Sequence, residues 1–361
     1  MDTFQIPVGP LHVALEEPMY FRLDVDGERV AAVEITAGHV HRGIEHLTER
    51  RNFWQNIVLT ERVCSLCSNS HPQTYCMTVE AIAGIEVPVR AQYLRVIADE
   101  VKRVASHMFN VAILAHIVGF ESLFMHVMEA REIMQDVKET IFGNRMDIAA
   151  NTIGGVKYEL DDERVAWLVD QLDRLEPVIV GEIAPLYRTD RSILSRTRGV
   201  GVIGRQDCIE YGLVGPVARG SGLDNDIRRL APYAVYADLD FDVVTETDGD
   251  VWSRAMVRLG EIRQSIGILR QCLAKLPQGP SSLPGWPAIP AGEAVAKTEA
   301  PRGEVVYYLK TDGSTMPQRL KWRVPSYMNW DALGVMMKDA RISDIPLIVN
   351  SIDPCISCTE R

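Results

Sequence analysis

Two Cys-x-x-Cys pairs stand near opposite ends of the 361-residue chain, Cys64 with Cys67 and Cys355 with Cys358. Thiolates are strong, soft donors, and four of them from two such pairs can surround one metal centre. The chain has seven cysteines, and the other three lie far apart in the sequence at Cys76, Cys208 and Cys272. We expect these three to be buried free thiols. The sequence therefore predicts one thiolate-bound centre to which both ends of the chain contribute.

Three kinds of thiolate site contain such pairs. A structural zinc site usually closes a ribbon of about 15 to 20 residues between its pairs, whereas nearly the whole chain separates the pairs here. A thioredoxin-like redox motif does not account for a second pair. A redox-active nickel or iron centre needs soft thiolates, an enclosing core and nearby proton carriers. The flanking residues favour this third kind of site, and structural zinc remains the alternative.

Both pairs lie in longer motifs. The first is Arg-x-Cys-x-x-Cys-x-x-x-His over residues 62–71, and the second is Asp-Pro-Cys-x-x-Cys-x-x-Arg over residues 353–361. Together they resemble the signature of nickel-iron hydrogenase large subunits. The energy-converting, membrane-associated branch of that family is related to respiratory complex I, and the chain resembles it over its whole length, at residues 9–12, 15–18, 41–45, 152–155, 215–222, 300–303 and 351–354.

The resemblance implies a nickel-iron centre whose iron carries carbonyl and cyanide ligands. Cys64 and Cys355 would be terminal nickel ligands, while Cys67 and Cys358 would bridge nickel and iron. Such a subunit reversibly reduces protons to hydrogen and splits hydrogen heterolytically, so a base must take up a proton. By the same resemblance a terminal thiolate is the first base, and Glu17 is the next proton carrier.

Three further residues match the family's active site. Arg302 matches an arginine whose guanidinium is held over the open metal positions, where its permanent charge can orient the substrate. Asp353 either holds Arg302 by a bidentate pair or only forms the turn before Pro354. His71 either hydrogen-bonds a bridging sulfur or a nearby acid, or is simply a packed histidine.

Glu45 aligns with a glutamate that ligates magnesium in many relatives. There a C-terminal histidine completes the site, whereas Arg361 stands at that place here. A second departure is Ser65, where relatives often have glycine, and we expect the ligand geometry to survive it. Many relatives lose a C-terminal extension after nickel insertion, and we expect this chain to be encoded without one.

Composition and resemblance also bear on partners and location. The net charge of -11 disfavours a nucleic-acid partner. Residues 1–4 show no signal-peptide pattern, and the longest apolar run, residues 111–120, is shorter than the roughly 18 residues of a membrane span. The resemblance implies a cytoplasmic subunit, peripheral on the cytoplasmic face of the membrane. Its implied partners are an iron-sulfur small subunit, ferredoxin-like electron-transfer subunits and ion-pumping membrane subunits, with carbon monoxide dehydrogenase as a candidate electron source.

The elements that must position these residues can be read from hydrophobic periodicity. Alternation over residues 4–36 predicts an N-terminal hairpin, and apolar residues every three or four positions predict long helices over 89–142, after Asp161 and over 250–276. Five prolines and two glycines break the pattern over 277–290. A short strand is expected over 305–309.

These patterns predict a mainly α fold with small β elements, in which a long-helix bundle core carries an N-terminal β-hairpin. The resemblance implies the fold shared by nickel-iron hydrogenase large subunits and the complex I 49-kDa subunit. We expect one domain, 1–361, with N-terminal strands and a loop (1–46), a helical core (47–276), a Pro/Gly-rich segment (277–300) and a metal-binding segment (301–361). A catalytic hydrogenase subunit is therefore predicted. The alternatives are a complex I-like quinone-reductase subunit, a class that lacks the four cysteines, and a structural zinc-bound scaffold.

Overall fold

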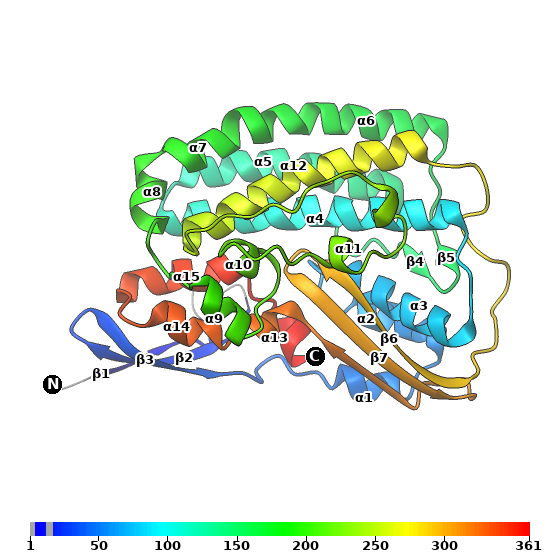
Figure 1. Cartoon of the computed structure of the whole chain (residues 1–361), viewed down its shortest axis with the longest axis horizontal. Helices are drawn as coiled ribbons and strands as arrows, with labels where there is room; N and C mark the ends of the chain where they lie inside the picture. Colours follow the sequence, from blue (N-terminus) through cyan, green and yellow to red (C-terminus); the bar gives the residue numbers. More distant parts are fainter. Residues whose placement is uncertain (1–3, 12–16) are drawn as a thin grey trace.

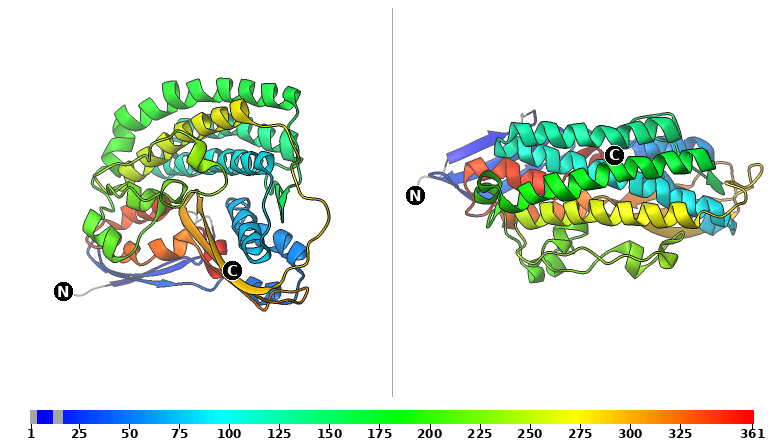
Figure 2. Two further views of the ribbon diagram at one scale, coloured as in Figure 1. Left: turned by 45° about the vertical axis from the view of Figure 1, so that its right-hand side comes forward. Right: turned by 90° about the horizontal axis from the view of Figure 1, so that it is seen from above.

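Four long helices lie side by side and form the upper layer of the molecule in Figure 1, and the view from above in Figure 2 shows the same packing. They are α4 (Val89–Val118), α5 (Glu121–Phe142), α6 (Asp162–Pro177) and α12 (Val251–Lys275). This computed structural model describes residues 4–11 and 17–361. The apolar stripe of α4 is fully buried between its neighbours, as its periodicity requires. The predicted class, mainly helical with small sheets, is confirmed.

Local signals set the ends of these helices. Asp161 and Asp250 cap α6 and α12, because each side chain accepts a hydrogen bond from a backbone N–H three residues later. Gly119 and Gly143 end α4 and α5 in the left-handed conformation. The shorter helical segments are α1 (Ile44–Thr48), α2 (Phe53–Glu61), α3 (Ser70–Ala83), η1 (Val178–Ile183), α7 (Ala184–Thr189), α8 (Arg191–Thr197), α9 (Arg205–Glu210), α10 (Gly215–Arg219), α11 (Ile227–Leu230), η2 (Tyr236–Asp238), α13 (Pro325–Asn329), α14 (Ala332–Met337), η3 (Ile342–Asp344), α15 (Ile345–Ile352) and α16 (Ile356–Glu360).

Three small antiparallel sheets complete the fold over the described residues. The predicted N-terminal hairpin is β2 (Tyr20–Asp26) with β3 (Arg29–Thr36), and β1 (Phe4–Val8) adds a third strand beside β2. A minimal pair joins β4 (Asn151–Thr152) to β5 (Gly155–Val156). The last sheet has the order β6 (Ala291–Ala300), β7 (Gly303–Asp312) and β8 (Arg319–Arg323).

The C-terminal sheet differs from the sequence prediction. The predicted strand 305–309 is only the middle of β7, and neither β6 nor β8 was predicted. β6 reads AGEAVAKTEA, and its alanine, glutamate and lysine residues favour a helix in isolation. Pairing along all ten residues of β7 and packing against α3 override that preference.

A second hydrophobic core lies below the bundle, between α2, α3 and the sheet β6–β8, and it contains all four cysteines of the two pairs. The hairpin turn between β6 and β7 brings Arg302 against the start of α10. Gly215 makes this approach possible, because a Cβ there would lie 2.0 Å from the carbonyl oxygen of Arg302, and its φ is +68°. Within the described residues, no helix combines the length and apolarity that a bilayer span requires.

Candidate metal centre

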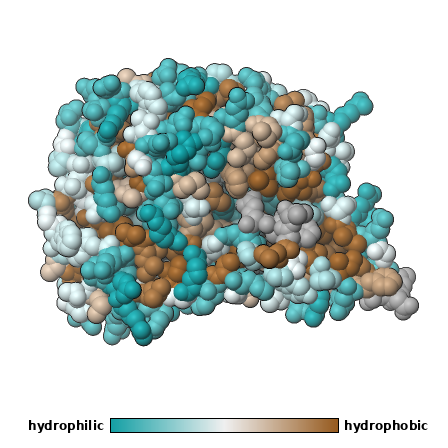
Figure 3. Space-filling view, turned by 180° about the vertical axis from the view of Figure 1, so that it is seen from behind, coloured by the Kyte–Doolittle hydropathy of each residue, from teal (hydrophilic) through white to brown (hydrophobic). Residues whose placement is uncertain are grey.

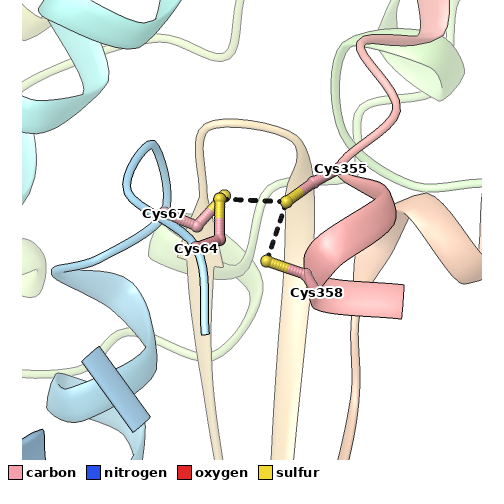
Figure 4. A group of neighbouring side chains, drawn as sticks. All are labelled: Cys64, Cys67, Cys355 and Cys358. Atoms are coloured by element: carbon pink, nitrogen blue, oxygen red, sulfur yellow. Dashed lines mark hydrogen bonds between the residues drawn. The ribbon is translucent and has the colours of Figure 1, made fainter. Parts of the chain in front are cut away.

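Two short segments bring the four cysteines together (Figure 4). Cys64 and Cys67 lie in the loop that joins α2 to α3, and Cys355 and Cys358 lie at the start and within α16. Their ligand atoms lie within 4.8 Å of one another, and each residue is at most 8% exposed. Among the residues that the structure describes, this is the one group of three or more metal-ligating side chains close enough to hold an ion.

The spacing of the sulfurs fits thiols or metal ligands rather than disulfides. Sγ of Cys355 lies 3.0 Å from Sγ of Cys64 and 2.8 Å from Sγ of Cys358, well beyond the roughly 2.05 Å of a disulfide bond. All seven cysteines are free, and Cys76, Cys208 and Cys272 are buried away from this group, as expected.

Charge on the sulfurs is the reason that the group suits a metal. A hydrogen bond from Cys355 lowers the pKa of Cys64 to about 7. Hydrogen bonds from Cys355 and Cys358, with the Arg302 charge nearby, lower the pKa of Cys67 well below its usual range. Burial raises the pKa of Cys358. Four buried thiolates can therefore coexist only with compensating positive charge, which a metal centre supplies.

Arg302 lies against the sulfur group and is 2% exposed. One terminal nitrogen donates to Sγ of Cys67 at 3.3 Å and to the hydroxyl of Ser106 at 3.3 Å. Nε donates to the carbonyl oxygen of Asp353 at 2.8 Å, and the other terminal nitrogen donates to its Oδ1 at 2.6 Å. The Arg302 guanidinium is thus held by one carboxylate oxygen and one main-chain oxygen of Asp353, and not by both carboxylate oxygens.

Asp353 also ends α15. Its backbone adopts the left-handed conformation (φ 54°, ψ 58°), which aspartate tolerates better than most residues. This turn redirects the chain into Pro354 and Cys355. Asp353 therefore both forms the turn and holds Arg302, the two roles that the sequence left as alternatives.

His71 contacts the group at Cys358 and lies in the first turn of α3. Its Nε2 is 3.1 Å from Sγ of Cys358, and its Nδ1 is 2.8 Å from the hydroxyl of Tyr307. Burial lowers the pKa of His71 to about 4. The imidazole is therefore neutral at pH 7, with one ring nitrogen as donor and the other as acceptor.

Glu17 contacts the segment between the last two cysteines. One of its oxygens accepts a hydrogen bond from the backbone N–H of Ser357 at 2.8 Å, and the other accepts from the Ser357 hydroxyl. The carboxylate is thus anchored to the residue directly before Cys358. His12, Leu15 and Glu16 of the same N-terminal motif lie outside the described residues.

Glu45 is not part of the sulfur group, and its surroundings do not fit a magnesium ion. Its carboxylate accepts a hydrogen bond from Nε of Arg361 at 2.8 Å and pairs with Arg319 at 3.3 Å. Lys321 is a third cation, 3.8 Å away. Three positive side chains already compensate this carboxylate and would repel a divalent cation.

Sequence reasoning missed the residues that tie the cysteine segments together. One terminal nitrogen of Arg42 donates to the carbonyl oxygens of Val63, at 2.8 Å, and of Ser357, at 3.0 Å. The buried Lys102 donates to the carbonyl oxygen of Ser65 at 2.8 Å. Arg42 lies in one of the motif segments, so its position could have been noted, but main-chain contacts of this kind leave no signature in one sequence.

Comparison with known proteins assigns this chain to a family. Residues 118–285 and 285–361 match the family model described as the respiratory-chain NADH dehydrogenase, 49 Kd subunit. Residues 42–116, which include the first cysteine pair, match the nickel-dependent hydrogenase model. The chain therefore belongs to the family that unites hydrogenase large subunits with the 49-kDa subunit of complex I, and the resemblance read from its motifs is confirmed.

Individual relatives agree with this assignment. The chain is 72% identical to the carbon monoxide-induced hydrogenase of Rhodospirillum rubrum over the full length of both proteins. It is 37% identical to the membrane-bound hydrogenase subunit alpha of Pyrococcus furiosus, covering 99% of this chain and 87% of that protein. It is also 37% identical to one of the NADH-quinone oxidoreductase subunits of Dehalococcoides mccartyi, covering 100% of this chain and 99% of that relative.

Proposed function

We propose that this chain is the catalytic large subunit of an energy-converting nickel-iron hydrogenase that reversibly reduces protons to hydrogen. The observation that carries the proposal is the buried group of four cysteine sulfurs. Soft thiolates in this number suit nickel and iron. The 72% identity to a carbon monoxide-induced hydrogenase supports the same activity.

The four cysteines would hold the metals, with Cys64 and Cys355 on nickel and Cys67 and Cys358 between nickel and an iron that carries carbonyl and cyanide. When bound, this centre supplies the redox chemistry of hydrogen. The chain itself encloses the site and keeps water out, since every cysteine is buried. Nε2 of His71 lies 3.1 Å from Sγ of Cys358 and would donate a hydrogen bond to that sulfur as a thiolate, which would reduce its charge.

Arg302 would orient the substrate beside the centre. Its guanidinium is fixed by Asp353 on one side and touches Cys67 on the other, so its charge stays in place during turnover. Among the residues that the structure describes, no group donates a hydrogen bond to the buried Oδ2 of Asp353.

Glu17 would carry protons between the centre and solvent. Glu17 is half-buried and accepts a hydrogen bond from Ser357, a residue that lies between Cys355 and Cys358 in the sequence. A carboxylate anchored there can take a proton from a cysteine sulfur and release it outward. Glu17 thus connects the enclosed centre with the surface.

The electrons require partner subunits. Cys76, Cys208 and Cys272 are buried and separate, so this chain has no set of cysteines left for an iron-sulfur cluster. We propose an iron-sulfur small subunit, ferredoxin-like electron-transfer subunits and ion-pumping membrane subunits, with carbon monoxide dehydrogenase as an electron source. The chain would then sit peripherally at the cytoplasmic face of the membrane. Figure 3 shows broad apolar areas on the lower part of one face, which suits a subunit with partners.

Metal analysis of the purified complex tests this proposal. Nickel, with at least one iron beyond the iron of the clusters, is expected to co-purify with the large subunit. Zinc alone would support the scaffold alternative. The second candidate is a complex I-like quinone-reductase subunit, because some relatives are named as quinone oxidoreductase subunits. Quinone reduction by a nickel-free complex would favour this candidate.

A further inference from the structure

Glu45 lies at the centre of a cluster of positive side chains. The cluster is distinct from the sulfur group and is formed by Arg361, Arg319 and Lys321 around this one carboxylate. The side chains of Arg361 and Glu45 are each 16% exposed. Their contact is therefore a largely desolvated, charge-assisted hydrogen bond and not an open surface pair.

Arg361 is held by more than the carboxylate. A terminal nitrogen donates to the carbonyl oxygen of Trp322 at 2.7 Å, and the guanidinium carbon lies 5.6 Å from the centroid of the Trp322 ring. That ring stacks on Tyr307 at 5.2 Å, and Tyr307 in turn hydrogen-bonds His71. The arginine thus fastens the end of α16 to Trp322, which stacks on the tyrosine that hydrogen-bonds His71.

Helix α16 needs such fastening. It has five residues, Ile356–Glu360, and a helix of that length is unstable alone. Glu360 supplies a second attachment, because its side chain accepts from the backbone N–H of Val40 at 2.6 Å and its carbonyl oxygen contacts Nδ1 of His41 at 2.5 Å. Cys358 lies in the same helix, two residues before Glu360, so its position depends on these attachments.

Magnesium does not suit this cluster. The ion requires about six oxygen ligands in octahedral geometry and keeps several waters, whereas Glu45 already accepts hydrogen bonds from two arginines. Among the described residues, Glu45 belongs to no group of three or more metal-ligating side chains.

We propose that the Arg361 guanidinium acts as a built-in cation at Glu45, locking α16 and so positioning Cys358 without any divalent ion. Arg361 is a positioning residue, because it touches the ligand-bearing helix and not the reacting atoms. The inference goes beyond the proposed function: it concerns how the helix is held and stands whichever metal the sulfurs bind.

Two measurements on the assembled enzyme test it. After dialysis against a chelator, magnesium should be absent from the large subunit, and hydrogen–deuterium exchange of residues 356–361 should not change when magnesium is added. A stoichiometric magnesium ion whose removal speeds that exchange would overturn the proposal. This measurement uses the unmodified enzyme, so its result is informative even if the variants misfold.

The second measurement uses Arg361→Gln. Exchange over residues 356–361 should become about tenfold faster, in keeping with the loss of a charge-assisted hydrogen bond, whereas Arg50→Gln, at an exposed arginine, should change nothing. Glu45→Gln combined with Arg361→Gln should be no worse than Arg361→Gln alone, because Glu45 acts on α16 through its contact with Arg361. Additive effects, or an Arg361→Gln result equal to the control, would refute the lock. Infrared bands of the metal centre are read independently, so failure here is distinguishable from failure of the proposed function.

Discussion

Nε2 of His71 lies 3.1 Å from Sγ of Cys358, and the opposite nitrogen of the same ring lies 2.8 Å from the Tyr307 hydroxyl. When Cys358 is a thiolate, it can only accept, so the Nε2 hydrogen is donated to sulfur and Nδ1 accepts from the tyrosine hydroxyl. The ring thereby links α3, β7 and α16 at a cysteine. Such a linkage fixes both the position and the electron density of the sulfur.

Replacing Cys355 by serine should abolish hydrogen turnover and nickel binding, since a hydroxyl neither ionises as easily nor suits a soft metal. Cys76→Ser is the matched control, because Cys76 is equally buried but lies outside the sulfur group. It should cost at most a few kcal/mol of stability. Nickel content and hydrogen evolution check both variants. Equal loss in the two would mean that the ligand assignment is wrong.

Glu17→Gln should keep the metals and their spectra but slow turnover by about two orders of magnitude or more. The amide preserves the contact with Ser357 yet cannot carry a proton. The exchange of deuterium gas with water protons measures this step directly. Glu28→Gln, at an exposed glutamate, is the control. Unchanged exchange in Glu17→Gln would place the proton route elsewhere, with Glu16 and Glu45 as the next candidates.

Arg302→Lys should retain nickel and iron but lose most activity. A lysine ammonium cannot reach Asp353 and Cys67 together, because it lacks the planar fork that makes both contacts. The comparison of metal content with hydrogen evolution separates this outcome from a loss of cofactor. Wild-type rates in the lysine variant would show that only the charge matters.

His107 predicts a pH dependence of stability that is separate from the metal centre. It is buried beside Glu261 in the bundle, and burial lowers its pKa to about 4. Between about pH 6.5 and pH 4 the unfolded chain binds a proton that the folded chain does not, so stability is full above this interval and falls as the pH decreases through it.

His107→Gln should remove this contribution. The loss of unfolding free energy between pH 6.5 and pH 4 should be smaller than in the wild type by as much as about 3 kcal/mol, measured by urea unfolding. His116, exposed and paired with Glu121, gives the matched control, His116→Gln. An identical pH slope in wild type and His107→Gln would contradict a neutral buried His107.

The bundle was predictable because long periodic segments decide their own structure. The repeats within 89–142 and 250–276 became α4, α5 and α12. β6 was not predictable, because its residues favour a helix and only the pairing with β7 makes it a strand. Local preference fails where long-range contacts supply most of the stabilisation.

The candidate site likewise contains some residues that the sequence could predict and others that it could not. The four cysteines could be grouped because their type and spacing point to one chemistry, and the motifs added Arg302, Asp353 and His71. The anchoring roles of Arg42 and Lys102 could not be foreseen, because they act on main-chain oxygens of distant loops. The magnesium expectation at Glu45 came from the resemblance alone, and the cations around that carboxylate argue against it.

An infrared spectrum of the purified complex distinguishes a nickel-iron centre from any other metal bound to the four cysteines. We expect carbonyl and cyanide stretching bands from an iron held by Cys67 and Cys358, and these bands should disappear in Cys355→Ser and persist in Cys76→Ser. A preparation that evolves hydrogen without such bands, or that holds only zinc at the four cysteines, would contradict the assignment of a nickel-iron centre to this chain.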